Sequence, residues 1–251
     1  MEEKFKEAPR DYSLLAIAGF ILAVLAGITA ISAGFGNRLG IWNFRTGMLI
    51  LRWAAYCGGI AGVTALIGAI LTRPGSRHRG FSLALLGLLI AFAVTGLPWS
   101  FWRYAKLLPA IHDITTDTEN PPSFRAVLPL RKGLNLAEYG GPKLASQQRA
   151  AYPDIVPLEL PLPPEQAFQK ALSAARALGW RIVAAEDSQG SIEATDTTFW
   201  FGFHDDIVVR IKATKQGSRI DVRSLSRVGK SDLGTNAQRI RKYFRTLKET
   251  G

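Results

Sequence analysis

Three long apolar runs fill most of the first hundred residues and predict membrane-spanning helices over residues 13–33, 53–71 and 81–101. A helix of roughly 20 residues, rising about 1.5 Å per residue, crosses the hydrocarbon core of a bilayer. No acidic residue occurs between Asp11 and Asp113, which fits a chain in lipid because a carboxylate there is costly. The first run is longer than the apolar core of a cleaved signal peptide, so we expect it to be retained.

Small residues recur at every fourth position of the second run, in the rows Ala54, Gly58, Gly62 and Ala61, Ala65, Ala69. Such rows let helix backbones approach closely in lipid, and we expect them to pack within the three-helix anchor of residues 13–104. Aromatic residues gather at positions 99–104, at the end of the third run. Their placement is typical of the aromatic belt at a membrane interface.

Basic residues around the apolar runs predict the orientation of the protein. The short loop at residues 73–79 holds three arginines, and cytoplasmic loops are enriched in such charge. The pattern therefore places the tail at residues 1–12 in the cytoplasm and the C-terminal half outside it. We expect a multi-pass protein of the bacterial cytoplasmic (inner) membrane with a periplasmic or other extracytoplasmic domain.

Residues 105–153 show no sustained periodicity and are interrupted by proline and glycine, as at Asn120-Pro-Pro122 and Gly140-Gly141. We interpret them as a polar tether without regular elements. The segment also holds more aliphatic and aromatic residues than a disordered linker, so we expect it to lie against the domain that follows.

Residues 154–251 alternate between strand and helix patterns and predict a soluble α+β domain. Strands are expected over 154–162, 180–186, 191–197, 207–213 and 219–225, and a helix runs from Pro163 to Gly179. The closing helix is predicted to bury Ala237, Ile240, Phe244 and Leu247 and to expose Arg239, Arg241, Lys242, Arg245 and Lys248. The order β-α-β-β-β-β-α indicates an antiparallel sheet with both helices on one face.

Composition argues against several classes of site. The single cysteine, Cys57, excludes an intramolecular disulfide, and the three histidines lie far apart, so no metal site and no cofactor are expected. The net charge is +11, but residues 107–251 contribute only +4 of it, from 20 basic and 16 acidic residues. The basic character thus belongs mainly to the membrane loops, and we expect no nucleic-acid partner.

An aromatic stretch at residues 198–203 precedes two adjacent acids and is the first candidate site. Trp200, Asp205 and Asp206 could line a pocket with a polar mouth, or the aromatics could be buried core and the acids solvated. We favour the core interpretation. Neighbours in a strand point to opposite faces, which makes Asp205 and Asp206 a poor acid–base pair.

The second candidate is the stretch at residues 224–236, called here the signature stretch. Its candidate ligand-binding residues are Arg227, Gly229, Ser231, Asp232, Gly234 and Asn236. A helix N-terminus with glycines and polar side chains suits an anion or a hydroxylated ligand. Helix capping by Asp232 or Ser231 explains part of the set equally well, and both interpretations stay open.

The signature stretch also carries a family resemblance. Residues 194–206, with Phe-Trp-Phe-Gly-Phe-His-Asp-Asp, and residues 220–240, with Arg-Ser-Leu-Ser-Arg-Val-Gly-Lys-Ser-Asp-Leu-Gly-Thr-Asn, are similar to a bacterial family known as domain of unknown function 1499. The lead-in at 113–122 fits as well, so the resemblance covers about 112–249, in a form with N-terminal transmembrane helices. The resemblance implies no known activity.

These observations favour a membrane-anchored cell-envelope protein whose exported domain binds a ligand or a protein partner without catalysis. A first alternative is an envelope hydrolase or transferase using Ser231 and Asp232, although no nucleophile-elbow motif is present and His204 is the nearest histidine. A second alternative is a structural module whose basic last helix lies on a membrane surface. The identity of the ligand and the oligomeric state stay open.

Overall fold

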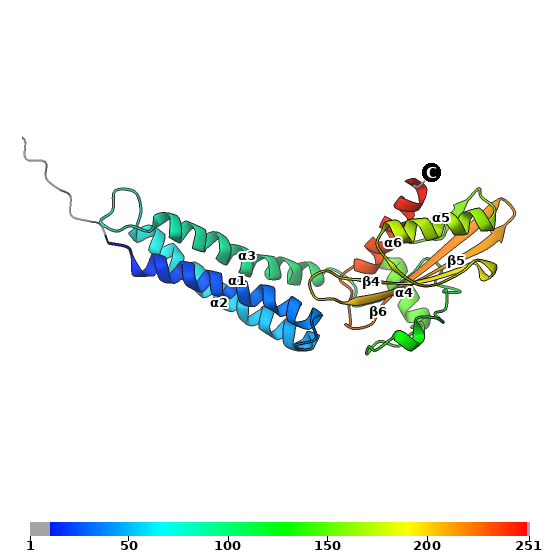
Figure 1. Cartoon of the computed structure of the whole chain (residues 1–251), viewed down its shortest axis with the longest axis horizontal. Helices are drawn as coiled ribbons and strands as arrows, with labels where there is room; N and C mark the ends of the chain where they lie inside the picture. The colour runs from blue at the N-terminus through cyan, green and yellow to red at the C-terminus, as the bar shows by residue number, and fades with distance from the viewer. Residues whose placement is uncertain (1–10, 250–251) are drawn as a thin grey trace, which may run out of the picture. The chain divides into compact units, whose positions relative to one another are not determined.

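A computed structural model describes residues 11–249, and the chain divides into two compact units on either side of Arg103 and Tyr104. Most of the predicted tail, residues 1–10, lies outside the described residues. The first unit consists of three helices and the second of a sheet with helices (Figure 1). The two units are described in turn.

The helices of the first unit are α1 (Leu14–Arg38), α2 (Phe44–Leu71) and α3 (Phe81–Ala105). Each is long and apolar enough to cross a membrane, which supports membrane association. The helix α2 begins nine residues before the apolar run that predicted it, because the side chain of Asn43 accepts a hydrogen bond from the Thr46 amide and caps an extra, more polar stretch.

Small residues form the contact between α1 and α2. A Cβ atom added at Gly19 would lie 2.6 Å from the Ala65 Cα, and one added at Gly68 would lie 2.7 Å from the Ala16 Cα. Ala61, together with Ala65, is fully buried. Backbone contact at this distance excludes any larger side chain, so dispersion between close backbones holds the pair together.

The second unit is an antiparallel six-stranded sheet. Its elements are β1 (Asp113–Thr115), η1 (Leu128–Leu130), α4 (Gly141–Ala151), β2 (Leu158–Leu160), α5 (Pro164–Ala177), β3 (Arg181–Glu186), η2 (Asp187–Gln189), β4 (Ser191–Thr197), β5 (His204–Thr214), β6 (Gly217–Ser226) and α6 (Thr235–Glu249). The strand order is β1-β6-β5-β4-β3, and β2 pairs with the same β6 further along. The predicted fold class, three apolar helices before an antiparallel α+β domain, is confirmed.

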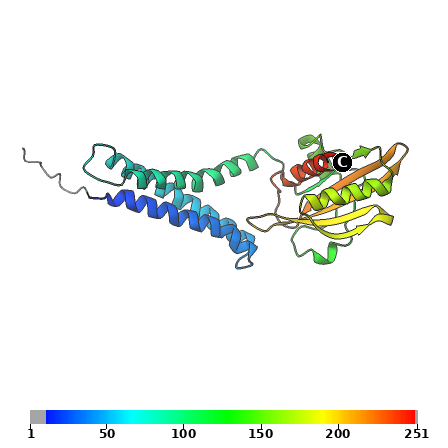
Figure 2. The same ribbon diagram turned by 45° about the horizontal axis from the view of Figure 1, so that its top comes forward.

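The main core lies between the sheet and the helices α5 and α6, which cover one face (Figure 2). Alternate residues of β5 and β6, among them Val209 and Val222, meet Phe168 of α5 and Ile240 of α6. Alternation along these strands directs one set of apolar side chains to this face. Tyr243 of α6 is fully buried, and its hydroxyl donates to the Ala171 carbonyl oxygen at 2.9 Å.

The segment 105–153 differs from the prediction, because it contains β1, η1 and α4. The strand β1 has only three residues, too few for a periodic signal. Its free edge is held by the side-chain amide of Gln148 in α4, which accepts from the Thr115 N–H at 2.9 Å and donates to the Thr115 carbonyl oxygen at 2.6 Å. Both β1 and α4 therefore belong to the sheet unit.

The closing helix also differs from the prediction at two positions. Ala237, Ile240 and Leu247 are buried as predicted, but Tyr243 is fully buried in place of Phe244, which is only partly buried. Arg239, which was expected to be exposed, is buried because it meets the carboxylates of Asp196 and Asp205. The periodicity of the helix does not reveal these carboxylates on the sheet, which make the burial of the Arg239 charge possible.

The helix contact predicts the effect of a single methyl group. Gly68→Ala should lower the free energy of unfolding by about 1–3 kcal/mol, since its Cβ has no room against the α1 backbone. Gly59→Ala in the same helix is the matched control, because nothing lies within 4 Å of its Cβ position. Unfolding by SDS titration in detergent micelles measures both, and equal stability of the two variants would contradict the contact.

Candidate functional site

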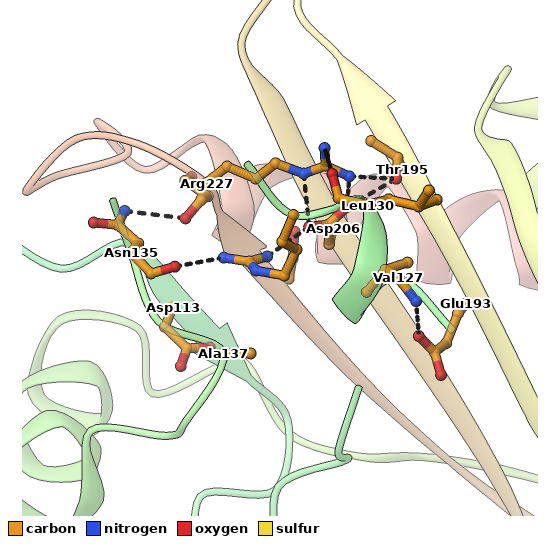
Figure 3. Close-up of polar contacts among 12 residues, drawn as sticks. Asp113, Val127, Leu130, Asn135, Ala137, Glu193, Thr195, Asp206 and Arg227 are labelled. Atoms are coloured by element: carbon orange, nitrogen blue, oxygen red, sulfur yellow. Dashed lines mark hydrogen bonds and ion pairs between the residues drawn. The ribbon is translucent and has the colours of Figure 1, made fainter. Parts of the chain in front are cut away.

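Asp206 is the central acid on the sheet face opposite α5 and α6 (Figure 3). Its carboxylate accepts two hydrogen bonds from the Arg227 guanidinium, at 2.9 Å and 2.8 Å, and one from the Arg131 guanidinium at 2.5 Å. The Thr195 hydroxyl donates to the same carboxylate at 2.8 Å. Asp206 is fully buried. A buried carboxylate needs such partners, so Arg227 is part of a buried ion cluster that includes Arg131 from residues 105–153, called here the lead-in chain.

Asp205 points to the other face of the sheet and meets a different arginine. The guanidinium of Arg239 donates to Asp205 at 2.6 Å and to Asp196 at 2.8 Å. It also donates to the Ser224 hydroxyl at 3.2 Å and to the side-chain oxygen of Asn236. The two adjacent acids therefore belong to separate ion clusters on opposite faces.

Asp232 caps α6. Its two carboxylate oxygens accept hydrogen bonds from the backbone N–H of Gly234 at 2.9 Å and of Asn236 at 2.8 Å. Burial raises the pKa of this carboxyl above its usual range, although the two backbone donors oppose that shift. Gly229 and Gly234 have φ angles of +95° and +77°, the left-handed conformation that glycine adopts without strain. The loop thus has the geometry of a helix cap.

The remaining bonds of the signature stretch hold the chain that enters the sheet unit. The N–H groups of Ser226 and Asp232 donate to the carbonyl oxygens of His112 and Ile111 at 3.0 Å and 3.1 Å. The side chain of Asn236 donates to the His112 carbonyl oxygen at 2.9 Å, and the Ser231 hydroxyl donates to that of Pro109 at 3.4 Å. Four bonds from residues 226–236 therefore clamp residues 109–112, which follow α3.

Arg223 and Asn135 make further contacts between the signature stretch, β6 and the lead-in chain, on the sheet face opposite α5 and α6. Neither was identified from the sequence as a candidate site residue. The guanidinium of Arg223 donates twice to Asp113, at 2.9 Å and 2.8 Å, and once to the Ala137 carbonyl oxygen at 2.8 Å. The side chain of Asn135 donates to the carbonyl oxygens of Ser226 and Gly229 at 3.0 Å and 2.9 Å. Alternation along β6 gives the face on which Arg223 lies, but not its partner 110 residues earlier.

Glu193 of β4 is a further buried acid with a structural role. Its carboxylate accepts the backbone N–H groups of Arg125 at 2.8 Å and of Ala126 and Val127 at 3.0 Å each. These are the donors that precede the short helix η1 (Figure 3). The acid thereby fixes the lead-in chain where it crosses the sheet.

Residues 113–247 match a family model described as Protein of unknown function (DUF1499). The matched region takes in β1, all the ion clusters and the signature stretch, and it covers more than half of the chain. The chain belongs to this family. No curated protein matches the chain. The family description names no activity, so the chemistry of the DUF1499 domain has to be argued from its side chains.

Trp200 lies in the β4–β5 loop of the DUF1499 domain. Phe201 is buried and stacks on Phe203, with ring centroids 5.2 Å apart, whereas Phe199 is 77% exposed and Trp200 is 37% exposed. The favoured interpretation, buried aromatics beside solvated acids, therefore holds for Phe201. It is wrong for Phe199 and Trp200, which are exposed. It is also wrong for Asp205 and Asp206, which are buried because they meet arginines.

The candidate residues do not converge on one cleft. A cleft of about 630 Å³ opens on the face opposite α5 and α6, and its lining consists of Asn120, Pro121, Ser123, Phe124, Leu128, Leu136, Ala137, Glu138, Tyr139 and Arg223. None of the candidate site residues named from the sequence is in that lining. Most of the signature stretch is engaged in capping, ion pairing and chain clamping.

Arg227 tests whether the signature stretch stabilises the fold. Arg227→Ala should lower the free energy of unfolding by about 3–5 kcal/mol, because Asp206 loses a buried bidentate partner. Lys230→Ala removes the same charge from an exposed position of the same loop and should change it by less than about 0.5 kcal/mol. Pulse proteolysis of the full chain in detergent across a urea series gives both values, and similar losses would refute the role of the pair.

Asn236 tests the clamp itself. Asn236→Ala should speed hydrogen exchange at the Ser226 and Asp232 amides, since the carbonyl oxygens that accept from them lose their anchor. Gln238→Ala, an exposed change in the same helix, should leave these amides unchanged. Hydrogen exchange of the full chain, followed by mass spectrometry, measures the exchange rates of these amides in both variants. Faster exchange across the whole sheet in Asn236→Ala would contradict a local clamp and indicate global destabilisation.

Proposed function

We propose that the protein is a membrane-anchored, non-catalytic binding module of the bacterial cell envelope. The proposal rests on one observation: the side chains of the DUF1499 domain that could act as an acid, a base or a nucleophile already form hydrogen bonds or ion pairs within the domain. Both oxygens of Asp232 accept backbone N–H groups, and Asp205 and Asp206 are paired with arginines. Ser231 is bonded to backbone groups on both sides. The alternative hydrolase or transferase built on Ser231 and Asp232 gains no support from this arrangement.

The cleft beside Phe124 is our candidate for the binding face. Its volume of about 630 Å³ falls in the range of roughly 300–1,000 Å³ that small-molecule sites occupy. The hydroxyl of Tyr139, in its lining, is buried and has no hydrogen-bond partner among residues 11–249. Burial raises the pKa of Tyr139 to about 12, so the hydroxyl stays a neutral donor. A ligand with apolar or aromatic surface and a hydrogen-bond acceptor suits these walls.

Orientation follows from charge. The arginines at residues 73–79 favour a cytoplasmic loop between α2 and α3, which leaves the N-terminus in the cytoplasm and the DUF1499 domain outside it. The inner membrane of a bacterium with a periplasmic domain fits this pattern. The ligand or protein partner would then belong to the envelope.

Cysteine accessibility tests the orientation. In a Cys57→Ala background, Gln216→Cys in the β5–β6 turn should react with a membrane-impermeant maleimide added to intact cells. His78→Cys, in the loop between α2 and α3, should react only after permeabilisation. The reverse pattern would place the domain in the cytoplasm.

Paired leucine variants test binding against catalysis. Leu136→Glu puts a charge into the cleft lining and should abolish rescue of the envelope defect of a deletion strain, scored as survival in detergent. Leu134→Glu, at another exposed leucine that lies outside the lining, and Ser231→Ala should both rescue fully. Loss of rescue by Ser231→Ala, at normal protein level, would favour the hydrolase instead.

A further inference from the structure

The chain enters the sheet unit at one end of the sheet, called here the entry end. Asp113 of β1 pairs with Leu225 of β6, Leu225 pairs with Asp206 of β5, and Asp206 pairs with Thr195 of β4. Three segments lie beyond this row of residues. They are the entering chain at 106–112, the β4–β5 loop at 198–203 and the β6–α6 loop at 227–234 (Figure 2).

Apolar side chains are exposed on all three segments. Phe199 is 77% exposed and Trp200 is 37% exposed, in a loop that holds no charged residue. Leu107 on the entering chain is exposed as well. Leu233 is 39% exposed, although its φ of +54° is a left-handed conformation that costs a non-glycine residue roughly 1–2 kcal/mol. Leu233 lies in the turn that caps α6, where its N–H donates to the Ser231 hydroxyl and its side chain reaches solvent.

The covalent path between α3 and β1 is short. Seven residues, 106–112, separate the end of α3 at Ala105 from β1, and they span at most roughly 25 Å at about 3.5 Å each. The clamp described above fixes residues 109–112 to the domain, which shortens the free path further. Strands lie about 4.8 Å apart, so β4 is only about 14 Å across the sheet from β1.

From these observations we propose that the β4–β5 loop inserts Phe199 and Trp200 into the headgroup region of the bilayer that holds α1, α2 and α3. Aromatic rings are the side chains that favour this layer, where the ring body is buried and the indole N–H stays hydrated. Leu233 and Leu107 extend the same apolar end, and Lys230 adds an exposed cation for anionic headgroups. The domain is then docked on the membrane at two places, through its covalent connection and through this loop. The proposal requires membrane anchoring but not the proposed cleft or orientation.

The test measures the depth of the loop in the full chain in nanodiscs of phosphatidylcholine and phosphatidylglycerol. Phe199→Cys in the Cys57→Ala background is labelled with the fluorophore NBD. The matched control is Gln216→Cys at the opposite end of the β5–β6 hairpin, roughly 33 Å away along β5. Doxyl groups on the lipids report contact with the bilayer, and aqueous iodide reports contact with water.

The label at position 199 should show blue-shifted emission, quenching by doxyl lipid and loss of iodide quenching, and the label at position 216 should show the reverse. Equal iodide quenching at both positions would overturn the proposal. Protection of position 199 from both quenchers would overturn it too, since the ring would then be covered by protein. Trp200→Cys serves as a second labelled site with the same expected outcome, so the result does not depend on one variant.

Discussion

Buried charge is the constraint on which the sheet unit depends. Asp206 is enclosed with Arg227 and Arg131, and Arg223 is enclosed with Asp113. A charge removed from water is tolerated only when its partner is in place, and removal of one partner leaves the other uncompensated. Since Arg131 and Asp113 come from the lead-in chain, the strands β5 and β6 cannot bury their charged face unless that chain lies across it.

This constraint makes the two faces of the sheet different in kind. The face under α5 and α6 is held mainly by non-directional apolar packing around Val209, Val222 and Ile240, with the Arg239 ion cluster beside it. On the opposite face the apolar cluster is small, and directional bonds dominate, in which Glu193 and Asp206 accept from backbone and guanidinium groups of the lead-in chain. Directional contacts fix the path of a chain that has little regular structure, and the cleft beside Phe124 is formed by that path.

The signature stretch has a clear physical role in this arrangement. Its residues cap α6, pair with Asp206 and hold residues 109–112, so they determine how the chain that follows α3 joins the domain. The aromatic β4–β5 loop lies at the same end of the sheet as this joint, so the two most distinctive sequence stretches of the protein are neighbours there.

The sequence alone determined the elements with strong periodicity. Three apolar runs predicted α1, α2 and α3, two runs flanking a turn predicted β3 and β4, alternation predicted β5 and β6, and the stripe containing Ile240 predicted α6. It could not predict β1 or α4, because a three-residue strand and a helix whose buried face includes Gln148 carry no periodic signal. Only the tertiary structure decided what the polar residues do. Arg227, Asp232 and Asn236 could equally have bound a ligand, and their roles depend on partners such as Asp206 and His112, which strand pairing brings close from distant parts of the chain.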